Sequence, residues 1–144
     1  MPILYSTETA GFGTSPVSPP RAPAYGGRVK AIRNVITLAS QTTSDAIHLG
    51  VIPAGAIPLP GVLAASASLG SSVVAIGTNS THGSNGQLRA AATFTATDTP
   101  TFFGVVAGID DTPYSSDTPI YLTIATANLP ASGTLVVILY YLQP

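Results

Sequence analysis

The chain has 144 residues, the length of one ordinary domain, and this is enough to bury a core without disulfides or metals. Only 8% of the residues are charged, whereas roughly a quarter is usual for soluble domains. Neutral polar surface is easier to bury against a partner than charged surface, so this composition favours a component of an assembly over a lone monomer. The absence of cysteine excludes both a disulfide framework and a thiolate metal site.

Residues 1–27 are predicted to form an extended N-terminal arm. They contain five prolines and four glycines and show neither helical nor strand periodicity. The same segment lacks the basic and apolar regions of a secretion signal, and no stretch approaches the roughly 20 apolar residues of a membrane span. We therefore expect an arm over residues 1–27, a β domain over residues 28–144, and no contact with a membrane.

After Gly27 the sequence consists of short runs rich in Val, Ile, Thr and Tyr, separated by turn clusters such as IPAGAIPLPG and GTNSTHGSNGQ. About eight strands without a credible helix indicate an all-β fold, a two-sheet β-sandwich of the jelly-roll type or a related barrel. The predicted strands are Val29–Leu38, Ala46–Ile52, Val62–Leu69, Val73–Thr78, Leu88–Thr97, Phe102–Ile109, Ile120–Ala127 and Thr134–Leu142.

The last predicted strand is apolar on both faces. Leu135, Val137 and Leu139 alternate on one face, while Val136, Ile138 and Tyr140 occupy the other. Such a strand should be covered on both sides, either within the domain or by another chain. Together with the low charge, this pattern predicts that the isolated protein is a dimer or trimer.

The two histidines of the chain do not suggest catalysis. His48 lies in an alternating strand on the face opposite Ile47 and Leu49, and His82 lies in a loop rich in Gly and Asn. Neither sits in a motif that would place a base beside a nucleophile. We interpret His48 as an exposed or interface residue and His82 as a polar loop residue, and we expect no catalytic residue and no enzyme activity.

The acidic residues are scattered along the chain. A loop calcium site built from Asp110, Asp111 and Asp117 is conceivable, because turns with oxygen ligands suit calcium. Their spacing matches no calcium loop, however, and aspartate is common in turns for backbone reasons alone. The sequence therefore predicts no metal and no cofactor.

Charge is distributed unevenly along the chain. The first 33 residues carry four cations against Glu8, a net charge of +3, while residues 34–144 carry Arg89 against five aspartates, a net charge of −4. The cations either merely solubilise the arm or dock it on an acidic neighbour. Four cations without interleaved aromatic residues form a poor surface for nucleic acid, so we expect no direct nucleic-acid binding.

Residues 42–78 contain several short segments rich in small and turn residues: Thr43-Ser44-Asp45, Leu49-Gly50, Ile52-Pro53-Ala54-Gly55-Ala56, Ser68-Leu69-Gly70-Ser71 and Ala75-Ile76-Gly77. These segments resemble a family of small structural proteins encoded among phage and prophage head genes. The basic arm ending in Tyr25-Gly26-Gly27-Arg28 is also similar to that family, specifically to jelly-roll decoration or cement proteins of short-tailed phages.

The resemblance implies a virion protein on the capsid exterior, made in the cytoplasm of a bacterial host. It would clamp neighbouring major capsid proteins of an HK97-type shell. The alternative is a head-fibre or tail-fibre knob that binds a receptor or a carbohydrate, for which Tyr114 is the candidate loop platform. For the clamp, the residues expected to bind the partner are Ile3, Leu4, Tyr5, Phe12, Arg21 and Arg28.

Overall fold

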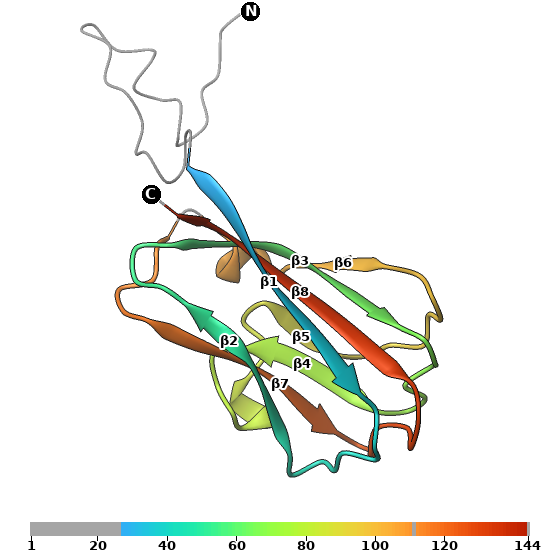
Figure 1. The fold of residues 1–144 in the computed structure, drawn as a ribbon. Helices are drawn as coiled ribbons and strands as arrows, with labels where there is room; N and C mark the ends of the chain where they lie inside the picture. The colour runs from blue at the N-terminus through green and yellow to red at the C-terminus, as the bar shows by residue number, and fades with distance from the viewer. Residues whose placement is uncertain (1–26, 111, 144) are drawn as a thin grey trace, which may run out of the picture.

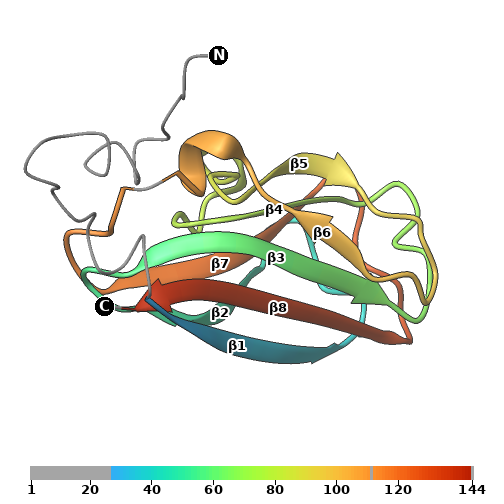
Figure 2. The ribbon, with the colours of Figure 1, turned by 90° about the horizontal axis from the view of Figure 1, so that it is seen from above.

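The computed structural model describes residues 27–110 and 112–143, which form two four-stranded antiparallel sheets packed face to face (Figures 1 and 2). Two short 3₁₀ helices, η2 (His82–Ser84) and η3 (Val106–Gly108), lie in the connections. The strands are β1 (Arg28–Thr37), β2 (Ala46–Ile52), β3 (Ile57–Ala65), β4 (Val73–Gly77), β5 (Arg89–Thr93), β6 (Thr101–Phe103), β7 (Thr118–Ala125) and β8 (Thr134–Gln143).

The strand order is β1-β8-β3-β6 in one sheet, here called sheet A, and β2-β7-β4-β5 in the other, called sheet B. Consecutive strands therefore cross repeatedly from one sheet to the other, which is the arrangement of a jelly roll. The predicted all-β sandwich of eight strands is confirmed.

The core lies between the two sheets because each strand turns alternate side chains inward. In β8 the inward positions are Leu135, Val137 and Leu139, all buried. From sheet B, β7 contributes Ile120, Leu122 and Ile124 in the same way. The residues predicted to alternate on one face of each of these two strands are therefore the ones that form the core.

The third strand begins five residues earlier than predicted, at Ile57 instead of Val62. The sequence IPLPG indicated a turn, yet Pro58 is paired with Tyr141 of β8. On its other side β3 pairs with β6 only from Gly61 to Leu63, so no strand there requires the missing N–H of Pro58. A bulge between Leu59 and Val62 absorbs the irregularity.

Two predicted strands are each five residues shorter in the structure. The strand predicted to reach Thr97 ends at Thr93, and the strand predicted to reach Ile109 ends at Phe103. After Phe103 the chain turns into η3, where Gly108 passes against the backbone of Gln87, a contact that leaves no space for a side chain. The prediction of strand over these residues was wrong because the valines favour a strand locally, whereas the turn depends on the close approach of Gly108 to the Gln87 backbone, a tertiary contact.

Arg89 is half-buried at the start of β5 and binds only backbone carbonyls. Its guanidinium donates to the carbonyl oxygens of Ala92 and Thr93, each at 3.1 Å, and to that of Val74. Burial lowers the pKa of Arg89 because desolvation disfavours its charged form. The Arg89 side chain thus holds β4 and β5 together where their pairing is irregular.

We expect Arg89→Ala to lower the free energy of unfolding by about 2 kcal/mol, because several carbonyls lose a charged donor. Urea denaturation followed by circular dichroism measures the change. Arg28→Ala, at an exposed position in β1, is the matched control and should stay within about 0.5 kcal/mol of the parent protein. Equal stability of the two variants would contradict the assigned role of Arg89.

Candidate interaction surface

The outer face of sheet A is an apolar surface that runs across all four strands. Strand register places Val35 beside Val136, Val136 beside Ala64, and Val62 beside Phe102. Among these, Val35 is 54% exposed and Phe102 is 77% exposed. The apolar side chains of this face include Val29, Ala31, Val35, Val62, Ala64, Phe102, Val136, Ile138 and Tyr140.

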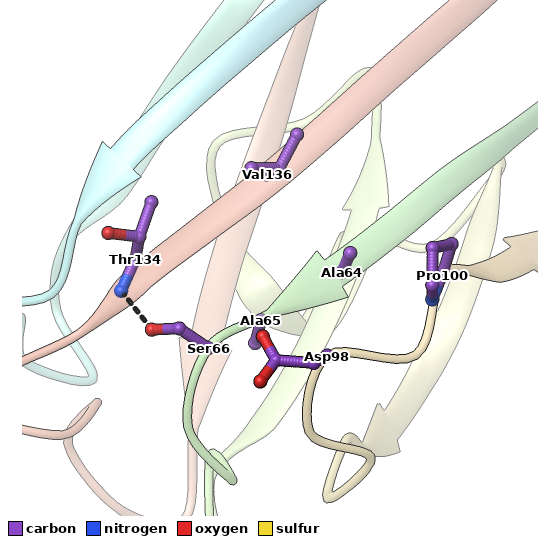
Figure 3. A pocket seen from close by; sticks show the side chains of 7 residues that line it. All are labelled: Ala64, Ala65, Ser66, Asp98, Pro100, Thr134 and Val136. Atoms are coloured by element: carbon purple, nitrogen blue, oxygen red, sulfur yellow. Dashed lines mark hydrogen bonds between the residues drawn. The ribbon is translucent and has the colours of Figure 1, made fainter.

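A hollow of about 290 Å³ opens on this face beside β3 and β8 (Figure 3). Ala64 and Val136 present small apolar side chains to it, while Thr134 and Ser66 close one end with a 2.8 Å hydrogen bond from the Thr134 N–H to the Ser66 hydroxyl. Asp98 brings a carboxylate to its rim. The hollow is therefore apolar with one acidic edge.

The free cations of the described residues gather on a single strand. Arg28, Lys30 and Arg33 all lie on β1 and are exposed, whereas Arg89 is held by carbonyl groups. β1 pairs with β8 on one side only and forms one edge of sheet A. Arg33 lies in the row of Ile138, so its side chain belongs to the outer face.

The predicted partner-binding residues fall almost entirely outside the described part of the chain. Ile3, Leu4, Tyr5, Phe12 and Arg21 precede residue 27. Arg28 is the first residue of β1, in register with Gln143, and is exposed. The binding role of this group stays a prediction.

Both histidines lie against the outer side of sheet B. His48 is exposed and stacks edge-on against Tyr121, with ring centroids 5.4 Å apart. The Nδ1 atom of His82 is 3.2 Å from the Thr123 hydroxyl. Asn85 fastens the same loop to the sheet by donating to the carbonyl oxygens of Ala75 and Tyr121. His48 therefore has the exposed placement that its strand pattern predicted, and His82 serves as a loop contact.

We expect the double substitution His48→Gln and His82→Gln to leave particle assembly and infectivity within a few-fold of the parent phage. Glutamine retains a polar group at both positions, and the Asn85 contacts keep the loop in place. Plaque counts and gel analysis of purified particles measure the effect. Loss of infectivity with an unchanged melting temperature would instead assign these histidines a functional role.

Two of the aspartates that suggested a calcium loop use their carboxylates to accept hydrogen bonds from backbone N–H groups. Asp117 accepts from the Ala54 N–H at 2.9 Å, and Asp110 accepts from the Thr112 N–H at 2.9 Å. Asp111 lies outside the described residues. Within residues 27–110 and 112–143, no cluster of three or more His, Cys, Asp or Glu side chains could hold a metal ion.

Tyr114, the candidate platform for a sugar, packs against the core. Its backbone is held in two hydrogen bonds, from Tyr114 to Ala56 and from Gly55 to Tyr114, and burial raises the pKa of its phenol. A half-buried ring of this kind presents little flat surface to a ligand. The structure thus weakens the main sequence argument for a carbohydrate-binding module.

Solved structures with the same architecture come from phage capsids. A chain of the cyanophage Pam1 capsid asymmetric unit superposes with a TM-score of 0.65 and 22% identity, covering 83% of this chain and 88% of that one. The fold is that of phage capsid chains. The capsid of Ralstonia phage GP4 gives a TM-score of 0.63 at 22% identity, with coverage of 82% and 86%.

A third chain, from the acid-stable capsid of Helicobacter pylori bacteriophage KHP30, gives a TM-score of 0.58 at 14% identity, with coverage of 81% of this chain and 88% of that one. No protein-family model and no curated protein sequence matches the chain. Among the described residues, no helix has the length and apolar character needed to cross a bilayer. The comparisons establish the fold over most of the chain.

Proposed function

We propose that this protein is a structural component of a tailed-phage virion, a decoration or cement protein on the outside of an HK97-type capsid. In this role it clamps neighbouring major capsid proteins and has no catalytic activity. The observation that carries the proposal is the shared fold with chains from three phage capsids, each covered over more than four fifths of its length.

The surface properties of the sandwich support this role. Only 8% of the residues of the chain are charged, so that docking to another protein requires little ion desolvation. Exposed valine and phenylalanine side chains on one sheet form the apolar area that a partner would cover. The jelly-roll domain would sit between neighbouring capsid subunits. The Pro- and Gly-rich segment before it could reach up to about 85 Å across those subunits if fully extended.

The test is decoration of purified shells. Recombinant protein should co-sediment with HK97-type capsids lacking it, at a fixed stoichiometry relative to the major capsid protein, and should raise the temperature at which the shells rupture. Binding to a glycan array or to host cells without binding to shells would favour a fibre knob and would contradict the proposal.

A further inference from the structure

We infer that the outer face of sheet A is the interface of a two-fold symmetric homodimer. The inference deepens the proposed function, because it identifies the surface through which two copies of the protein join before or during attachment. It starts from β8, whose second apolar face, Val136, Ile138 and Tyr140, no described strand or 3₁₀ helix covers (Figures 1 and 2).

Exposure of apolar side chains is concentrated on this face. Five large hydrophobic side chains are exposed in the described part of the chain, and three of them, Val29, Val35 and Phe102, lie on this face. They come from the two edge strands β1 and β6, so the apolar area spans the full width of the sheet. An area of this extent marks a site of association in a soluble protein.

The dimensions of the face fit a second copy. Four strands about 4.8 Å apart, each with roughly eight residues of about 3.3 Å, give an area of roughly 500 Å². Two such faces together bury on the order of 1,000 Å², the lower bound for a specific interface. A flat face packed on an identical face makes an isologous contact, which closes at two copies.

The charges on this face are complementary under two-fold symmetry. Arg33 lies on β1 in the row of Ile138, while Asp98 lies at the hollow, where its N–H donates to the Ala65 carbonyl at the end of β3. Strand β8 separates β1 from β3, so the cation and the anion stand on opposite sides of the face. A two-fold axis that lies in the plane of the face, midway between the two residues, would bring Arg33 of each copy to Asp98 of the other and form the same pair twice.

The hollow gives the second copy a place to insert an apolar side chain. It is an open hollow of about 290 Å³, and Ala64 and Val136 contribute the apolar part of its lining. Asp98 at its rim sets the orientation, because a second aspartate opposite would repel it. A second copy would bring to this hollow a surface that is apolar and carries Arg33, which matches the apolar floor and the acidic rim.

Sedimentation equilibrium of the full-length protein at micromolar concentration tests the inference. The parent protein should be a dimer, and Phe102→Asp should raise the dimer dissociation constant at least roughly 100-fold. Val106→Asp is the matched control, since Val106 is 80% exposed but lies in η3, and the residue before it, Val105, donates its N–H to the Leu88 carbonyl at 3.1 Å. It should dimerise like the parent, and circular dichroism should show that both variants are folded.

A charge exchange provides the second readout. Arg33→Asp and Asp98→Arg should each weaken the dimer roughly tenfold, and the double variant should restore most of the affinity. A monomeric parent protein, or a dimer that Phe102→Asp leaves intact, would overturn the inference. So would a dimer that is lost on removal of residues 1–27, which would identify the arm as the occupant. Because no capsid is present, these results do not depend on whether decoration itself occurs.

Discussion

Deleting residues 1–27 is expected to abolish stable decoration of purified shells while leaving the melting temperature of the β domain within a few degrees of the parent value. The buried core cluster of the described residues runs from Leu38 to Leu139, and the deletion leaves all of these side chains in place. The first strand begins at Arg28 and keeps its full pairing with β8. The deletion should therefore reduce attachment to shells without reducing the stability of the β domain.

The loss of attachment follows from what an arm contributes across a subunit boundary. Main-chain hydrogen bonds and apolar anchors at Ile3, Leu4, Tyr5 and Phe12 would all be removed at once. Arg21 contributes less, because an exposed ion pair typically gives roughly 0 to 1 kcal/mol and is screened by salt. Arg21→Ala should therefore weaken decoration only slightly, with the larger effect at low salt.

The measurement is binding of both proteins to undecorated capsids, read by sedimentation and gel densitometry at two salt concentrations. A variant in which residues 1–27 are replaced by a Gly/Ser segment of equal length is the matched control, and it should also fail to decorate. Equal occupancy for the full-length and deleted proteins would show that the arm is a passive tail. The sandwich alone would then have to provide attachment.

The sequence predicted the sandwich because hydrophobic alternation is a local property. In β7 and β8 the side chains that alternate in the sequence are those that became buried. Where proline interrupts the pattern, as at Pro58, the residue preferences of turns predicted a turn, and the structure has a strand there. The actual strand depends on which side of β3 has a hydrogen-bonding partner, and this is a property of the assembled sheet.

The candidate interface was only partly predictable for a related reason. The sequence predicted a second apolar face on one strand, formed by Val136, Ile138 and Tyr140. Val35, Phe102 and Asp98 did not, since they belong to segments separated by tens of residues. Only the order β1-β8-β3-β6 makes these positions neighbours, and no short-range pattern encodes that order.

The second prediction concerns Gly61, where the packing of sheet A leaves no space for a side chain. Gly61 is in register with Phe103 of β6, whose buried ring lies over it. A Cβ atom at this position would collide with the ring and would lie 2.7 Å from the Ile138 carbonyl oxygen of β8. The ring could rotate only into a packed core, and the carbonyl belongs to the backbone of the central strand, so neither neighbour yields easily.

Gly61→Ala is therefore expected to lower the free energy of unfolding by about 3 kcal/mol, at the upper end of the usual cost of overpacking, and the melting temperature by roughly 10 °C. Gly83→Ala is the matched control, because a Cβ at Gly83 meets no other atom within 4 Å, and its stability should change by less than about 1 kcal/mol. Urea denaturation and thermal scans of both variants provide the measurement. If Gly61→Ala proved as stable as Gly83→Ala, the close packing of Phe103 over β3 would be wrong, and with it the position of Phe102 on the outer face of sheet A.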